Sequence, residues 1–361
     1  MLFFIMFTEK QKSLKKQKYS VVEQSVLGVK VLRINIVYCP FILFVIRNIT
    51  GIMKLFKEYP MKKRIKKCLY AISRTPMGPV IHCLWETLAY IELHFFSFIW
   101  FLCGAKKPNK AQQKLMRENV TFVFKSFERQ RLVKRLYKNI QRYYPGINVI
   151  IVDDSSKSLE LTGPGLQVVQ VPFNSGLSKG LNKGLELVQT PFVVRMDDDE
   201  LLTPYSNFHK QLEFLLANSE IDLVGILPMN LPLRNHWKKQ GIDEYQKFNM
   251  ANAPKPLIIP HGTVIDANHV VLGKVPNIFI ARTDKYRNLG YDDNIRMIDH
   301  HEFFFRAAGN VVSVLDHSCF VAHIHSPFDH AYQVYRNDIL GDKQYIALKH
   351  AGYFLAKNLK M

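Results

Sequence analysis

From Glu118 onward, short runs of β-branched and aromatic residues alternate with segments whose apolar residues recur at helical spacing. The strand-like runs are 120–124, 149–152, 166–171, 192–196 and 223–226. Between them, apolar positions such as Leu181, Leu185 and Val188 define one face of a helix. This alternation of strands and helices predicts an α/β fold with a doubly wound, mainly parallel sheet covered by helices on both faces. Ligands of such sheets bind beyond the carboxyl ends of the strands.

The first 110 residues have a different pattern. Ile34–Ile46 is a dense apolar run of 13 residues, and Leu84–Cys103 is longer but contains Glu86 and Glu92. Crossing a bilayer takes about 20 apolar residues, so neither run compels a transmembrane helix. We expect interfacial or re-entrant helices on the cytoplasmic face of a membrane, with a single-pass helix as the alternative. The segment 105–113 is expected to be a polar linker.

The predicted domains are therefore a basic, apolar membrane-associating region with its linker (1–113), an α/β domain (114–345) and a C-terminal tail (346–361). The net charge of +19 is unevenly distributed among them. Residues 1–110 carry 19 Lys and Arg against 5 Glu, which is +14 of that total. Mixed with apolar runs, this charge favours an anionic membrane surface over nucleic acid as partner, although a solvated basic face is the alternative.

Five cysteines without a CxxC or Cys/His ligand spacing favour a reducing compartment. Three adjacent aspartates, Asp197, Asp198 and Asp199, end the apolar strand at 192–196. Carboxylate oxygens are preferred ligands of Mg²⁺ and Mn²⁺, so a metal that neutralises a nucleotide diphosphate is one interpretation. A helix that begins near Thr203-Pro204 and favours nearby acids is the other.

Two further segments are candidates for ligand binding. Asp153 and Asp154 follow the strand at 149–152, where a carboxylate accepts from a pyrimidine N–H or a ribose hydroxyl, or else forms a turn. The segment 174–184 (NSGLSKGLNKG) places glycines and exposed amides at a helix start, which favours anions, but it contains no Walker A motif. Its polar candidates are Asn174, Lys179 and Asn182, together with Gly176.

The segment 299–306 (DHHEFFFR) concentrates Asp299, His300 and Glu302 beside an aromatic run, without the spacing of a zinc site. His323 ends a later β-rich run, where a structural role is the alternative to metal binding. Apolar neighbours are expected to raise the pKa of Glu302 towards a value useful to a general base.

In combination and order, these segments resemble the glycosyltransferases of GT-A fold, chiefly family 2, and within them the catalytic domains of ganglioside-type β-1,4-N-acetylgalactosaminyltransferases. The likeness spans about 200 residues and rests on 121–145, 149–155 (VIIVDDS), 193–201 (VVRMDDDEL), 277–290 and 300–304 (HHEFF). It implies a GT-A fold, that is, a doubly wound mixed, mainly parallel sheet.

The resemblance also implies roles for the matched positions. Nucleotide-sugar binding is implied for Asp153, Asp154, Asn174, Gly176, Asn182 and Asp197, and we assign the neighbouring Lys179 and Asp198 to the same site. Asp199 and Asp197 match the DxD motif, and His323 matches a histidine that completes the metal site. Two positions depart from family 2: Leu181 replaces an arginine, and Asp299-His300 replaces Glu-Asp. The base is therefore open among Glu302, Asp299 and His300, with Glu302 placed first.

The reaction implied by the resemblance is the transfer of a hexose or N-acetylhexosamine from a UDP-sugar to a glycan or glycolipid hydroxyl, with inversion and with Mn²⁺ or Mg²⁺ as cofactor. It would serve the synthesis of surface polysaccharide or glycolipid. A sugar-phosphate nucleotidyltransferase shares this sheet and acidic site, but its Gly-rich signature is absent from 121–127. A non-enzymatic carbohydrate-binding protein would not need three adjacent aspartates.

Overall fold

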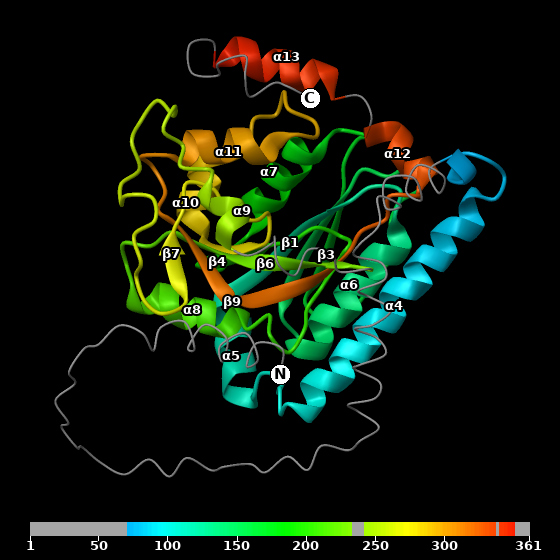
Figure 1. Ribbon diagram of the computed structural model, residues 1–361, viewed down its shortest axis with the longest axis horizontal. Coiled ribbons are helices and arrows are strands. Elements are labelled where there is room, and N and C mark those ends of the chain that lie inside the picture. Colours follow the sequence, from blue (N-terminus) through cyan, green and yellow to red (C-terminus); the bar gives the residue numbers. More distant parts are fainter. Residues whose placement is uncertain (1–70, 233–241, 337–338, 351–361) are drawn as a thin grey trace, which may run out of the picture. The chain divides into compact units, whose positions relative to one another are not determined.

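A nine-stranded mixed sheet organises residues 71–232, 242–336 and 339–350, which the computed structural model describes (Figure 1). Its order is β3-β2-β1-β4-β8-β6-β9-β5, and β7 also pairs with β9. The strands are β1 (Val120–Ser126), β2 (Asn148–Asp153), β3 (Leu166–Gln170), β4 (Phe192–Arg195), β5 (Glu200–Leu201), β6 (Leu223–Leu231), β7 (His269–Val271), β8 (Phe279–Arg282) and β9 (Ser313–Ile324). β3, β2, β1 and β4 are mutually parallel, as are β6 and β9, whereas β8 runs antiparallel between β4 and β6.

Helices cover both faces of this sheet. They are α4 (Gly78–Leu102), α5 (Lys110–Asn119), α6 (Gln130–Tyr143), α7 (Leu177–Leu187), α8 (Phe208–Ala217), α9 (Ile242–Gln246), α10 (Thr283–Leu289), α11 (Asp299–Ala307), α12 (His330–Arg336) and α13 (Leu340–Lys349). α5, α6 and α8 lie on one face of the sheet, and α7, α10 and α11 lie on the other (Figure 1). Phe122 and Phe124 of β1 belong to the apolar cluster of the first face, and Val123 belongs to that of the second. The period-two alternation of β1 therefore separates two apolar cores, as in a doubly wound sheet.

The close approach of α7 to the sheet depends on a glycine. A Cβ atom at Gly184 would lie 2.6 Å from Cγ1 of Val123 on β1, so a larger residue would push the helix outward. α5 begins inside the segment expected to be a linker. The Asn109 side chain accepts from the Gln112 N–H (3.0 Å), and the Gln112 side chain accepts from the Asn109 N–H (2.9 Å). This capping box satisfies two backbone donors and starts the helix at Lys110.

The apolar run expected at 84–103 lies within the longer helix α4. Ala89 and Trp100 of α4 pack against Leu201, Met229 and Ile324 at the β5, β6 and β9 side of the sheet. No helix in the described part of the chain is both long and apolar enough to span a bilayer. The run Ile34–Ile46 lies outside the described residues. The predicted boundary between 345 and 346 falls within α13, and the domain limits otherwise stay a prediction.

Candidate active site

Both acidic clusters lie at one edge of the sheet, beyond the carboxyl ends of three parallel strands. Asp154 follows β2, and the triple aspartate follows β4. Lys125 near the end of β1 pairs with Asp154, and Arg129, which follows β1, pairs with Asp198. Basic residues in and just after β1 thus pair with both acidic clusters, which are far apart in sequence.

Each residue of the triple aspartate pairs with an arginine, and Asp198 and Asp199 share the same one. The Asp197 carboxylate lies 2.9 Å from the guanidinium of Arg195, which is fully buried in β4. Asp198 binds Arg129 through two hydrogen bonds, and Arg129 also donates to Asp199 at 3.3 Å. Burial raises the pKa of Asp198 to about 6, although the charge of Arg129 offsets part of the rise. The positive charges of two arginines therefore compensate the three neighbouring carboxylates.

Asp199 also faces His323. The Nε2 atom of His323 lies 3.5 Å from Oδ1 of Asp199, because β5 pairs with β9 and aligns Glu200 with His323. Nδ1 of His323 donates to the side-chain oxygen of Asn230 on β6, which leaves Nε2 directed at the carboxylate. An imidazole oriented by such a second hydrogen bond is typical of metal-binding histidines.

Asp199 and His323 therefore fit a divalent cation, while Asp197 turns to Arg195. Within the described residues, no group of three His, Cys, Asp or Glu side chains is arranged to hold a metal. Two protein ligands suit a metal whose remaining positions are filled by a diphosphate and water, as is common for Mg²⁺.

Asp153 and Asp154 have distinct environments. Asp153 is fully buried, and its carboxylate accepts from Ser155 Oγ (2.6 Å) and from the Leu159 N–H (2.8 Å), so it shapes the turn after β2. Asp154 pairs with Lys125 and accepts from the Gly176 N–H at 3.3 Å. Burial raises the pKa of Asp154, and the Lys125 charge offsets this only partly. Asp154 thus links β1, β2 and the segment that begins at Asn174.

The predicted glycine-containing segment forms the turn into α7. Asn174 has a φ of 52° and Gly176 a φ of 102°, and Leu177 begins the helix. The Asn182 side chain donates to the Tyr291 carbonyl (2.8 Å) and to Asp293 (2.7 Å), so it braces the loop before α11. Lys179 is exposed on the first turn of α7. The structure therefore brings Asn174 and Gly176 next to Asp154, while Asn182 is engaged by the loop.

Three candidate residues lie in the first turn of α11 in different settings. Asp299 is 2% exposed, and its Oδ2 atom has no hydrogen-bond partner within the described residues. Burial raises the pKa of Asp299 to about 7, with a lowering by the charge of Arg195 and a further rise from Asp197. His300 instead donates from Nε2 to the Val275 carbonyl at 2.8 Å, and burial holds its pKa well below the usual value.

Glu302 is held by three basic side chains. Its carboxylate accepts from Arg306 (2.8 and 2.9 Å), from Lys349 (2.8 Å) and from His350 (3.1 Å). Burial alone would raise the pKa of Glu302, but the hydrogen bonds and charges of Arg306 and Lys349 bring it below the usual value. The expected rise in the Glu302 pKa is therefore wrong, because Arg306, one turn along the same helix, and Lys349 of α13 outweigh the effect of burial.

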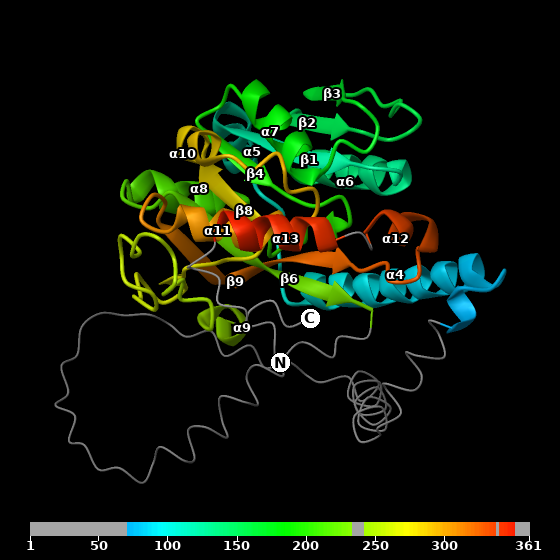
Figure 2. The ribbon, with the colours of Figure 1, turned by 90° about the horizontal axis from the view of Figure 1, so that it is seen from above.

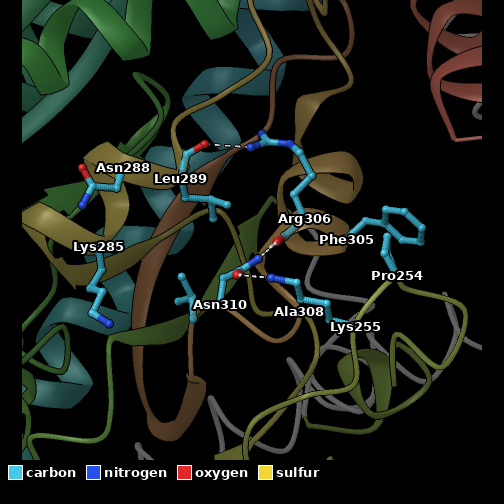
Figure 3. A pocket seen from close by; sticks show the side chains of 10 residues that line it. Pro254, Lys255, Lys285, Asn288, Leu289, Phe305, Arg306, Ala308 and Asn310 are labelled. Atoms are coloured by element: carbon cyan, nitrogen blue, oxygen red, sulfur yellow. Dashed lines mark hydrogen bonds between the residues drawn. The ribbon is translucent and has the colours of Figure 1, made fainter.

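Arg306 also donates to the carbonyls of Leu289 (2.7 Å) and Gly290 (2.9 Å), which ties α11 to α10 (Figure 3). It lines a cavity of about 520 Å³ together with Pro254, Lys255 and Phe305. The lining includes none of the acidic residues discussed above. This cavity is therefore separate from the acidic edge, where we place the chemistry.

Several residues of the site were missed by the sequence reasoning, namely Lys125, Arg129, Arg195, Asn230 and Tyr332. The Tyr332 ring of α12 lies 4.0 Å from the guanidinium carbon of Arg129 and stacks over it. Arg195 carried a usable signal, because a charge inside an apolar strand must find a partner on burial. The others gave none, since their partners are remote in sequence.

Comparison with known proteins identifies the family. Residues 121–321 match the profile described as "Glycosyl transferase family 2". The chain is 29% identical over 194 residues to human beta-1,4 N-acetylgalactosaminyltransferase 1, covering 53% of this chain and 36% of that protein. It is 28% identical over 204 residues to mouse beta-1,4 N-acetylgalactosaminyltransferase 2, covering 55% of this chain and 38% of that protein. The chain thus spans little more than a third of the length of these relatives.

Solved structures show weaker likeness. Residues 1–349 of S. aureus TarS align with a TM-score of 0.43 and 15% identity, covering 60% of this chain and 63% of that one. The mannosyltransferase PcManGT from Pyrobaculum calidifontis, in complex with GDP-Man and Mn²⁺, aligns with a TM-score of 0.43 and 16% identity, covering 77% and 76%. The expected family and its GT-A fold are confirmed by the profile match and the strand order. Because the matched residues make up more than half of the chain, the protein belongs to glycosyltransferase family 2.

Proposed function

We propose that this chain transfers a hexose or N-acetylhexosamine from a UDP-sugar to a hydroxyl of a glycan or glycolipid, with inversion at the anomeric carbon. The observation that carries the proposal is the placement of Asp299. It is a buried carboxyl whose pKa burial raises to about 7, and it interacts with both members of the Arg195–Asp197 pair at the end of β4. A base poised near neutral pH is what acceptor activation requires.

The donor is assigned to the edge of the sheet where the two acidic clusters lie. Asp154 suits the nucleoside, because it holds the turn at Asn174 and Gly176 in place beside it. Asp199 and His323 would hold Mn²⁺ or Mg²⁺, which when bound supplies positive charge to the diphosphate leaving group. Arg129, whose guanidinium lies 3.3 Å from Asp199, would add a second positive charge beside the same diphosphate.

The acceptor hydroxyl loses its proton to Oδ2 of Asp299, the atom without a hydrogen-bond partner in the described residues. The hydroxyl oxygen then forms a bond to the anomeric carbon while the bond from that carbon to UDP breaks. This assignment places Asp299 before Glu302 as the general base, which reverses the order expected from the sequence. Glu302 is committed to Arg306 and Lys349, and its lowered pKa makes it the weaker base.

A thermal-shift comparison of UDP and GDP, each with and without Mn²⁺, tests the donor and the metal. We expect the melting temperature to rise most with UDP and Mn²⁺ together. Transfer from UDP-linked hexoses and N-acetylhexosamines to glycan acceptors then tests the reaction. A preference for GDP would refute the donor class, and undiminished transfer in excess chelator would refute the metal.

A further inference from the structure

Helix α4 has apolar residues on two opposite faces, and only one of them is covered by the domain. Ala89 and Trp100 face the sheet. On the other side, Val80, Leu84, Leu88, Ile91, Phe98 and Leu102 form a row, called here the α4 stripe, in which every residue is exposed. At 100° per residue, the row lies within about 80° of arc. The exposed fractions of Leu84, Ile91 and Phe98 are 64%, 61% and 57%.

Exposing a row of large apolar side chains to water is unfavourable in free energy, so such a row marks a surface that binds a partner. Its surroundings indicate which partner. Arg74 before the helix and Lys106, Lys107 and Lys110 after it are all exposed, so the stripe is basic at both ends. The neighbouring helix α6 is joined to α4 by Arg131, which pairs with Glu86, and Arg135, which donates to Tyr90. The α4 stripe itself contains no charged residue.

We propose that the α4 stripe lies in the plane of an anionic membrane surface, with its apolar side chains below the headgroups and the flanking basic residues among them. An apolar row with basic flanks is the pattern of an interfacial helix. α4 is not apolar enough to cross the bilayer, which agrees with an in-plane position. Basic residues add attraction to an anionic leaflet, and salt weakens that part alone.

The same helix holds the segment that leads out of the active site. Trp85 of α4 donates from Nε1 to the His325 carbonyl (3.0 Å), and its ring meets Phe328 edge-on. His325 follows the candidate metal ligand His323, and the segment continues into α12. α12 lies near the N-terminal end of α4 in both views (Figures 1 and 2). On the proposed function, this placement favours an acceptor glycan anchored in the same leaflet.

The test places a tryptophan on the stripe of the full chain and quenches it from the lipid side. Phe98→Trp is compared with Leu216→Trp on α8, where the replaced side chain is similarly exposed at 53% but lies off the stripe. Vesicles contain equal parts of phosphatidylcholine and phosphatidylglycerol, with brominated acyl chains as quencher. After subtraction of the wild-type signal, we expect quenching for Phe98→Trp and little for Leu216→Trp. Adding Leu84→Gln or Ile91→Gln should weaken vesicle binding of the stripe by about tenfold each.

Quenching reports only on the position of the introduced tryptophan. Vesicle binding through residues 1–70 would therefore not produce the expected difference between Phe98→Trp and Leu216→Trp. Equal quenching at the two positions overturns the proposal, even if the chain still binds vesicles. A blue-shifted Phe98→Trp emission without lipid, with or without a dimer in light scattering, also overturns it, because the stripe is then covered by protein. Loss of transfer activity bears on the proposed function and leaves this test unaffected.

Discussion

Replacing Asp299 by Asn separates its role as a base from its role in the fold. The substitution keeps the shape of the side chain and removes the ionisable group. Removing a general base costs about 10²–10⁴-fold in rate. UDP affinity should stay nearly unchanged, because Asp299 has no part in the Asp154 or Asp199 contacts described above.

The raised pKa of Asp299 also predicts an effect on stability. A rise from 3.8 to about 7 means that the folded state binds this proton more tightly than the unfolded state. Stability is therefore lost as the pH rises through this interval, by up to about 4 kcal/mol for a shift of about three units. Asn does not titrate, so Asp299→Asn should be more stable than the wild type at about pH 8 and similar to it at about pH 4.

Transfer rates over a pH series, UDP affinity by calorimetry and urea midpoints at the two pH values measure these effects. One unit below the pKa of Asp299, about a tenth of the base is ionised, so the wild-type rate at about pH 6 should be about tenfold below its plateau. Arg195, Asp197, Tyr286 and Tyr291 interact with Asp299 and set the position of this rise.

Glu302→Gln is the matched control on the same helix. It should lower stability at neutral pH, because Arg306 and Lys349 lose their shared carboxylate, and reduce the rate less than Asp299→Asn does. If Asp299→Asn keeps a near wild-type rate while Glu302→Gln loses activity with UDP affinity intact, the base is Glu302 and the reasoning from burial fails.

Three further predictions concern the acidic edge and α13. Asn230→Ala should weaken Mn²⁺-dependent UDP binding by about 10–100-fold in calorimetry, because His323 loses the hydrogen bond that orients it. Arg129→Met should lower the stability measured in urea by about 3 kcal/mol or more, since it leaves Asp198 and Asp199 buried without their cation, and Mn²⁺ should restore more stability than in the wild type. Asp342→Ala should cost about 2 kcal/mol and speed amide exchange at 296–298, because its carboxylate accepts from those three N–H groups.

Each of these has a contrary outcome. Unchanged Mn²⁺ affinity in Asn230→Ala would mean that His323 does not bind the metal. A wild-type urea midpoint for Arg129→Met would show that the two carboxylates are hydrated or protonated. Asp342→Asn keeps one acceptor oxygen, so it should retain part of the protection at 296–298. Equal exchange in the Asn and Ala variants would exclude Asp342 as the acceptor for these N–H groups.

The local sequence pattern was sufficient to predict much of the fold and the position of the acidic residues. The alternation of strand-like runs and helical spacing predicted the layered sheet, because side-chain periodicity reports which face of an element is buried. The strand-end positions of Asp154 and Asp197 predicted a shared edge, since parallel strands bring their carboxyl ends together. The order of these segments was also enough to suggest family 2.

The partners of those residues were decided only by the tertiary structure. Asp299 and Glu302 are three positions apart on α11, and the sequence shows only Arg306 as a nearby partner of Glu302. The fold adds Lys349 of α13 to Glu302 and places Arg195 near Asp299. The two apolar faces of α4 are likewise alike in sequence. Packing against β6 and β9 buries one and exposes the other, because burial depends on contacts made by elements more than a hundred residues away.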